Sequence, residues 1–78
     1  MTHDRITIDP KIMFGKPVIK GTRVPVELIL RKIAAGMTES EILKHHPHLT
    51  GDDIRAAAAF AADHLANEEI VLASGSTW

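Results

Sequence analysis

The sequence predicts a small, mainly α-helical domain that has three helices and a short N-terminal β-hairpin. Apolar residues recur at helical spacing in separate stretches between residues 25 and 66. Two of these stretches begin with a threonine that is followed three residues later by an acidic residue, a pattern typical of helix N-termini. Before them, residues 15–26 combine glycine, proline and β-branched residues as tight turns and short strands do. These observations indicate one mainly helical domain.

A short strand is expected over residues 5–8, where polar and apolar side chains alternate. Asp9-Pro10 ends this strand, because this dipeptide is typical of turns. The apolar residues that follow, Ile12, Met13 and Phe14, are predicted to cover the core.

A hairpin is expected next, from Gly15 to Val24. Pro17 disfavours helix just before it, and Val18-Ile19 prefer an extended backbone. Lys20-Gly21 supplies the turn, since Gly21 tolerates a positive φ angle at no steric cost. Residues 22–24 would then return as a second short strand.

The first helix is predicted over residues 25–35, with Pro25 at its first position and Gly36 as its C-terminal cap. Glu27 and Arg31 are neighbours on its outer face, one helical turn apart. Its inward stripe consists of Val26, Ile29, Leu30 and Ile33.

The second helix is predicted from the Thr38 cap to about His46, where Pro47 stops it. Glu41 lies three residues after the cap and completes a capping box. Its residues Ile42 and Leu43 are expected to point inward.

The third helix repeats this arrangement, with Thr50 as the cap and Asp53 three residues later, and it continues to about Ala66. Its inward stripe is predicted to be Ile54, Ala58, Ala61 and Leu65. An extended segment is expected at residues 69–72, and a disordered polar tail at residues 74–78, so that residues 1–73 form the single domain.

The length and composition limit the possible classes of protein. A chain of 78 residues buries only about 60 % of its unfolded surface, so a homodimer or a permanent partner is expected to add stability. The absence of cysteine excludes disulfides and cysteine-based zinc sites, and it fits a cytoplasmic location. No apolar run reaches the length of a membrane span, and the first residues do not resemble a signal peptide.

Charge is unevenly distributed along the chain. The formal net charge is −1, but residues 1–44 carry eight basic and five acidic residues, whereas residues 45–78 carry one basic and five acidic residues. A nearly neutral total does not indicate nucleic-acid binding, although the basic half leaves room for a local positive patch. The acidic half could meet a basic partner.

Residues 6–62 resemble a family of small bacterial and archaeal domains of unknown function, the one numbered 433. The residues that carry the resemblance are Asp9-Pro10, Gly15-Lys16-Pro17, Ile19 with Gly21-Thr22-Arg23-Val24-Pro25-Val26, and Ala35-Gly36-Met37. The resemblance implies a compact homeodomain-like or winged helix-turn-helix domain. It also implies an antitoxin of a toxin–antitoxin pair, whose partner is a PIN-like ribonuclease toxin.

Under that interpretation, the basic hairpin would block the acidic, metal-binding cleft of the ribonuclease. The residues expected to bind a partner protein or nucleic acid are Lys16, Lys20, Arg23, Arg31 and Lys32. A second candidate for partner binding is the extended segment Glu69, Ile70, Val71 and Leu72, which could add a strand to the edge of a partner's sheet. The same segment could equally pair with the N-terminal strand of its own chain or with a second copy.

Two alternatives remain open, a stand-alone DNA-binding regulator and a dimeric protein-interaction module. The third helix is a poor recognition helix, because Asp52 and Asp53 are both expected to face solvent in its first turn, followed by alanines that cannot read base edges. DNA contacts would therefore come from the basic residues, mainly by phosphate neutralisation.

We expect no catalytic activity and no cofactor. Glycines near Lys16 lack the order of a phosphate-binding loop, and no serine lies in the context of a nucleophile. His45 and His46 are adjacent on a helix and point about 100° apart, and Pro47 ends the helix before His48, so a metal site is not expected there.

Overall fold

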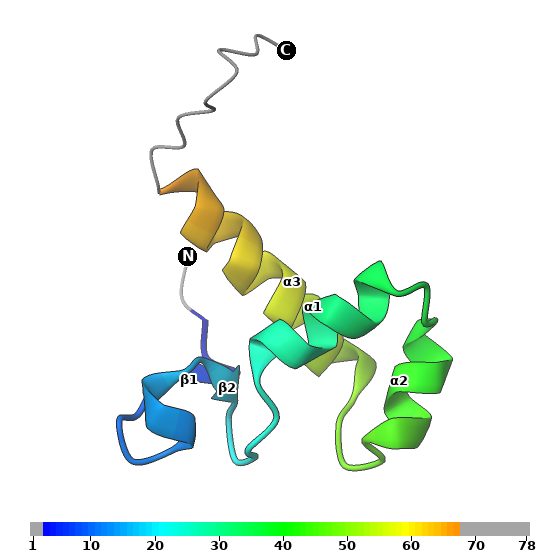
Figure 1. Ribbon diagram of the computed structural model, residues 1–78, viewed down its shortest axis with the longest axis horizontal. Helices are drawn as coiled ribbons and strands as arrows, with labels where there is room; N and C mark the ends of the chain where they lie inside the picture. The colour runs from blue at the N-terminus through cyan, green and yellow to red at the C-terminus, as the bar shows by residue number, and fades with distance from the viewer. Residues whose placement is uncertain (1–2, 68–78) are drawn as a thin grey trace, which may run out of the picture.

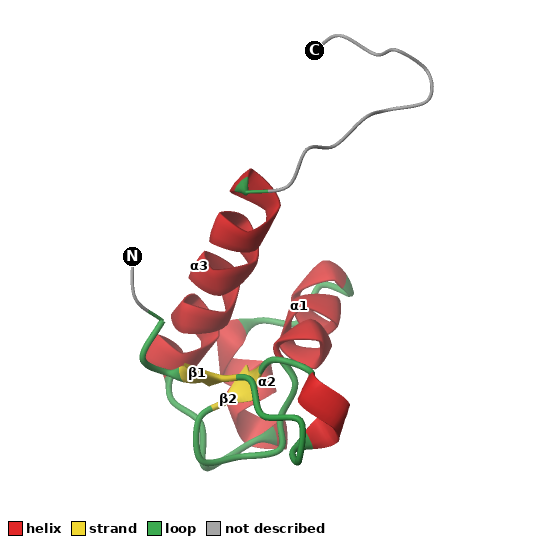
Figure 2. Ribbon diagram, turned by 90° about the vertical axis from the view of Figure 1, so that its left-hand side faces the viewer, coloured by secondary structure: helices red, strands yellow, loops and turns green. Residues whose placement is uncertain are grey.

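The computed structural model describes residues 3–67, so the segment predicted at Glu69–Leu72 and the tail at 74–78 lie outside the described part. In chain order the elements are β1 (Ile6–Thr7), the 3-10 turn η1 (Met13–Gly15), β2 (Val18–Ile19), α1 (Val26–Ala34), α2 (Glu39–His45) and α3 (Gly51–Ala66). The predicted fold class is confirmed. Figures 1 and 2 show the sheet, α1 and α2 gathered around the first half of α3, whose second half extends beyond them.

The sheet has two antiparallel strands, in which Ile6 pairs with Ile19 and Thr7 with Val18. After the turn at Gly21 (φ 80°), the chain does not return as the expected strand at residues 22–24, but forms a single bridge between Val18 and Pro25. The hydroxyl of Thr22 explains the difference. It donates to the carbonyl of Ile19 at 2.7 Å and accepts the backbone N–H of Val24 at 3.0 Å, and thereby replaces ladder bonds.

The predicted helix caps are confirmed. The hydroxyl of Thr38 accepts the N–H of Glu41, whose carboxylate accepts the N–H of Thr38 in return. The same reciprocal pair joins Thr50 and Asp53 at the start of α3. Gly36 ends α1 with a φ angle of 92°, as a left-handed cap requires. Pro25 was predicted at the first position of α1, but it lies one position earlier, as the N-cap, with an extended backbone.

The core lies where the three helices meet the sheet. Its buried members are Ile19, Val24, Val26, Ile29, Ile42, Leu49, Ile54 and Ala57. Asp53 is also buried, with 8 % of its surface exposed, and it accepts a hydrogen bond from Arg5 at 3.1 Å. The expectation that Asp52 and Asp53 both face solvent is therefore wrong for Asp53, because the pairing with Arg5 holds it against the start of the chain.

Several predicted core positions on the helices are wrong. On α3 the buried residues are Asp53, Ile54 and Ala57, so the prediction is confirmed for Ile54, whereas Ala58 is exposed and Leu65 is 53 % exposed. This buried face lies in the first two turns of α3. The last turns of α3 extend beyond the elements that could cover them (Figures 1 and 2). Ile33, near the end of α1, is 42 % exposed.

Phe14 also differs from the prediction, since 98 % of its surface is exposed. Met13 and Phe14 both have positive φ angles, 49° and 58°, and in this left-handed turn the Phe14 ring points away from the core. Ile12 and Met13 are half-buried. Within the described residues, no helix is both long and apolar enough to cross a membrane.

Candidate partner-binding surface

Three of the five basic residues predicted to bind a partner lie around one surface depression. Lys16, Arg23 and Arg31 line it together with Glu27, and its volume is about 430 Å³. The loop before β2 contributes Lys16, the turn after β2 contributes Arg23, and α1 contributes the other two. We call this depression the basic hollow. Its apolar lining comes from Met13, Pro25 and Leu28.

The charges of the basic hollow are only partly balanced. Glu27 forms ion pairs with Arg31 at 2.9 Å and with Lys16 at 3.6 Å. The hydrogen bond from Arg31, followed by the positive charge of Lys16, lowers the pKa of Glu27, so this carboxylate remains ionised. Arg23 is exposed and forms no ion pair within residues 3–67. The hollow therefore carries three positive charges and one negative charge.

The other two predicted basic residues lie elsewhere. Lys20 is exposed in the turn after β2 and does not line the basic hollow. The ammonium group of Lys32 donates to His45 Nδ1 at 3.1 Å and to His46 Nε2 at 2.9 Å. These histidines hold Lys32 at the end of α2, away from the hollow. Burial, assisted by Lys32, lowers the pKa of His46. In the described part of the chain, no three potential metal ligands come together.

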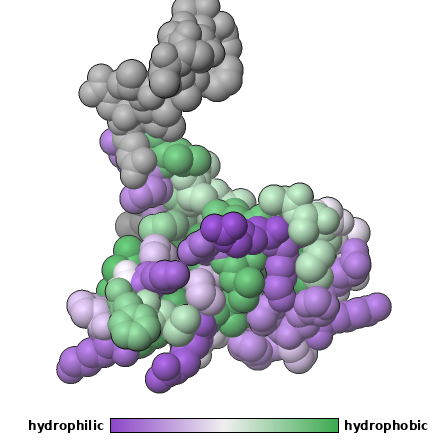
Figure 3. Space-filling view, viewed as in Figure 1, coloured by the Kyte–Doolittle hydropathy of each residue, from purple (hydrophilic) through white to green (hydrophobic). Residues whose placement is uncertain are grey.

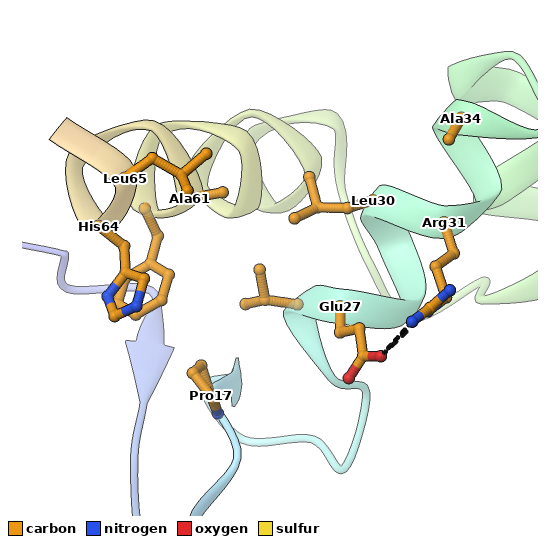
Figure 4. Close-up of a pocket in the computed structure, with 10 residues that line it drawn as sticks. Pro17, Glu27, Leu30, Arg31, Ala34, Ala61, His64 and Leu65 are labelled. Atoms are coloured by element: carbon orange, nitrogen blue, oxygen red, sulfur yellow. Dashed lines mark hydrogen bonds and ion pairs between the residues drawn. The ribbon is translucent and has the colours of Figure 1, made fainter. Parts of the chain in front are cut away.

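An apolar groove of about 490 Å³ lies between α1 and the second half of α3. Figure 4 shows Leu30 on α1 and Ala61 and Leu65 on α3 around this space, with Pro17 at one end. On the face seen in Figure 3, hydrophobic surface continues from α3 toward α1 and is bordered by hydrophilic side chains. The other apolar side chains that line the groove are Val26, Ala34 and Phe60.

The basic hollow and the apolar groove are contiguous. Glu27 and Arg31 line both of them, so this ion pair forms the ridge that separates the two depressions. The dashed line in Figure 4 marks this pair at the rim of the groove. One partner could therefore contact cationic and apolar surface at the same time.

Reasoning from the sequence missed the apolar groove and the exposed position of Phe14. Helical spacing predicts that Leu30 and Leu65 belong to core stripes, but this spacing is the same for a buried stripe and for the wall of an open groove. A cue for Phe14 was available, because three apolar residues between Pro10 and Gly15 lie in a turn, where few elements can cover them.

Three comparisons with known proteins identify the relatives of this chain. Residues 6–61 match the family model described as "Protein of unknown function (DUF433)". The chain is 39 % identical over 56 residues to the uncharacterized protein y4eO of Sinorhizobium fredii, a match that covers 72 % of this chain and 25 % of that protein. It is 57 % identical over 28 residues to an uncharacterized protein of Archaeoglobus fulgidus. This match covers 36 % of this chain and 78 % of the Archaeoglobus protein.

A solved structure is also similar. The crystal structure of a DUF433 member from Anabaena variabilis, at 2.00 Å resolution, matches with a TM-score of 0.75 and 29 % sequence identity. The match covers 80 % of this chain and 61 % of the Anabaena chain, and the chain spans only about a quarter of the Sinorhizobium protein. The family model, which matches most of the chain, and the shared fold lead to one conclusion: the chain belongs to the DUF433 family.

Proposed function

We propose that the chain is the antitoxin-like component of a toxin–antitoxin pair, and that it binds and blocks a PIN-like ribonuclease. The role comes from the resemblance of the sequence to antitoxin-like domains. The observation that carries the binding surface is the contiguity of the basic hollow and the apolar groove across Glu27 and Arg31. In this proposal the basic hollow faces the acidic, metal-binding cleft of the ribonuclease, and the apolar groove packs against the surface beside that cleft.

The chemistry of this surface suits a protein partner. Complementary charge speeds the encounter and selects the partner, while buried apolar area supplies most of the favourable free energy. Arginine is enriched in the centres of protein interfaces, and the basic hollow offers Arg23 and Arg31. Arg23 forms no ion pair within residues 3–67, so a partner carboxylate need not displace an internal one.

DNA binding is less well supported by the geometry of α3. Asp52 in its first turn is exposed and forms an ion pair with Arg55 at 2.6 Å, and Arg55 also reaches Glu39. The exposed positions that follow include Ala58 and Ala62, which cannot form side-chain hydrogen bonds with base edges. Autoregulation through DNA and homodimerisation remain predictions from the sequence.

The experiment is co-expression of the chain with the protein encoded by the adjoining reading frame, followed by affinity purification. We expect a stable complex, and we expect Arg23→Glu to weaken it by a factor of about ten or more, because a like charge would then face the acidic cleft. The matched control is Lys44→Glu on α2, which reverses an exposed charge that lies outside both depressions.

The two variants separate a specific contact from a general charge effect. Both change the net charge of the chain equally, so equal weakening would show that only total charge matters and would contradict the proposed surface. If no ribonuclease co-purifies with the wild-type chain and the chain retards its promoter DNA, the regulator alternative is correct instead.

A further inference from the structure

Phe14 is the most exposed of the large apolar side chains in the described part of the chain. Its exposed fraction is 98 %, compared with 59 % for Ile8 and 53 % for Leu65. An isolated exposed apolar residue needs no explanation in general. Phe14 is unusual because the backbone that carries it is also strained.

The strain lies in the left-handed turn at Met13–Gly15. Met13 and Phe14 have φ angles of 49° and 58°, a conformation that crowds the Cβ atom of any residue other than glycine. Gly15, at 82°, is the one residue of the three that adopts it without strain. Strained backbone of this kind persists only where the surrounding structure fixes it, and it is concentrated at functional sites.

Hydrogen bonds fix the turn on both sides. The N–H of Gly15 donates to the carbonyl of Ile12 at 3.1 Å, and the N–H of Lys16 donates to the carbonyl of Met13 at the same distance. Before the turn, the N–H of Ile12 donates to the carbonyl of Asp9 at 2.8 Å. These bonds hold the turn in one conformation while the Phe14 ring itself packs against almost nothing. The ring is therefore presented to solvent in a defined place.

That place adjoins the basic hollow. Met13 and Lys16, on the two sides of the Phe14–Gly15 pair in sequence, both line the hollow together with Arg23. Aromatic and arginine side chains are enriched in the energetic centres of protein interfaces, and here an aromatic residue lies next in sequence to Met13 and close in sequence to Lys16, which line the hollow together with arginine.

We propose that Phe14 is the apolar anchor of the partner-binding surface, inserting into an apolar pocket of the partner while Lys16 and Arg23 meet carboxylates around that pocket. This inference rests on the proposed function, and it specifies the partner surface as an apolar pocket within an acidic rim. Burial of the ring in the complex also explains why this turn has a phenylalanine, although asparagine or glycine would relieve the backbone strain of its positive φ angle.

A nucleic-acid strand could in principle stack a base on the same ring. The charges favour a protein partner, because Glu27 neutralises part of the basic hollow and would repel phosphates that lie along it. In addition, nucleic-acid strands that bind by base stacking usually contact several aromatic side chains along a basic groove. The basic hollow has one aromatic neighbour in the turn at Met13–Gly15.

The test is the Phe14→Asn variant, measured in two ways. Asparagine adopts positive φ angles more readily than phenylalanine, so we expect the melting temperature of the free chain to stay the same or rise. Binding to the co-purifying ribonuclease should weaken about thirtyfold, the effect of losing a central anchor. A residue with a merely structural role would show the opposite combination, lower stability and unchanged affinity per folded molecule.

Two control variants sharpen the result. Ile8→Asn removes a 59 % exposed apolar side chain outside the basic hollow and should change affinity less than about threefold. Phe14→Trp keeps a large aromatic ring and should retain most of the affinity.

Each remaining outcome overturns the inference in a recognisable way. If Phe14→Asn binds the ribonuclease as tightly as the wild-type chain, Phe14 is not an anchor, although the proposed function stands. If the wild-type chain forms no such complex, the proposed function and this inference fail together. If the substitution abolishes binding of single-stranded RNA and leaves the protein complex intact, the partner chemistry is wrong.

Discussion

Lys32 illustrates how the surroundings of a residue decide whether its charge is available to a partner. Its ammonium group is held by His45 and His46 at 3.1 Å and 2.9 Å, and this arrangement requires an unprotonated nitrogen on each imidazole ring. Arg23, by contrast, is exposed and forms no ion pair within the described residues. Two cations that look alike in the sequence therefore differ in what they can bind.

The contact between Lys32 and His46 predicts how stability changes with pH. Burial and the positive charge of Lys32 lower the pKa of His46 in the folded chain below its ordinary value of 6.5. As the pH falls through 6.5, His46 therefore takes up a proton in the unfolded chain before it does so in the folded chain. The free energy of unfolding decreases over the pH range between 6.5 and the lower pKa of His46 in the folded chain. We expect the melting temperature to fall when the pH is lowered from 7.5 to 5.5. It should fall less in His46→Gln, because the glutamine at position 46 does not titrate.

The control for this prediction is the behaviour of His46→Gln above pH 7.5. There His46 is neutral in both states, so any difference in melting temperature from the wild-type chain reports packing and hydrogen bonding alone. An equal fall in melting temperature for both proteins between pH 7.5 and pH 5.5 would contradict the assigned role of His46.

At the scale of elements, the helix starts are determined by short-range hydrogen bonds. Both α2 and α3 have a threonine N-cap whose side chain accepts the N–H three residues later, and the carboxylate at that third position accepts the N–H of the threonine. The cap of α3 has an additional role, because Asp53 also accepts a hydrogen bond from Arg5 beside β1. The start of α3 is thereby connected to the N-terminal sheet.

Removal of this cap should destabilise the domain measurably. We expect Thr50→Ala to lower the free energy of unfolding by about 1 kcal/mol, since it removes the hydroxyl that accepts the N–H of Asp53 and leaves this N–H only the backbone carbonyl of residue 50. Chemical denaturation followed by circular dichroism measures this change. Ser40→Ala on α2 replaces an exposed hydroxyl with no cap role and should stay within about 0.5 kcal/mol of the wild-type value. Equal effects of the two substitutions would contradict the importance of the cap.

These elements also show how far the sequence predicts the structure. The caps at Thr38 and Thr50 and the end of α1 at Gly36 were predictable, because each depends on residues within four positions. The buried face of α3 was predictable only in part, because it depends on which distant segments pack against it, as when Asp53 pairs with Arg5, 48 residues earlier. The hydrophobicity of Phe14 predicts a place in the core, whereas the left-handed backbone of its turn directs the side chain outward.

The candidate binding surface was also predictable from the sequence only in part. The sequence predicts Lys16, Arg23 and Arg31 as candidates for partner binding, and the fold brings these three around the basic hollow. It could not place Lys20 outside the hollow or show that Lys32 is held by histidines, because both facts depend on how separate segments pack. The apolar groove requires the relative position of α1 and α3, which helical spacing does not specify.

At the scale of the whole molecule, one continuous surface combines positively charged and apolar side chains. The basic hollow and the apolar groove lie on the two sides of the Glu27–Arg31 pair, and the second half of α3 extends beyond the core to form one wall of the groove (Figure 2). We therefore propose that the two depressions form one interface.

A single interface predicts that variants in either depression weaken the same complex. We expect Leu65→Ser, in the wall of the groove, to weaken ribonuclease binding about threefold to tenfold, because it removes buried apolar area from the complex. The melting temperature of the free chain should change little, since Leu65 is already 53 % exposed. Isothermal titration calorimetry measures the affinity.

The matched control is Ile33→Ser, which removes a 42 % exposed apolar side chain that lines neither depression. It should leave the affinity close to that of the wild-type chain. Weakening by Arg23→Glu without any effect of Leu65→Ser would restrict the interface to the basic hollow.

The most direct test of the central claim is a titration of the purified ribonuclease with this chain while RNA cleavage is followed. We predict that cleavage falls in proportion to added chain and stops at a fixed molar ratio, and that much more Arg23→Glu protein is needed for the same effect. Cleavage that continues unchanged with the wild-type chain in excess would contradict the account.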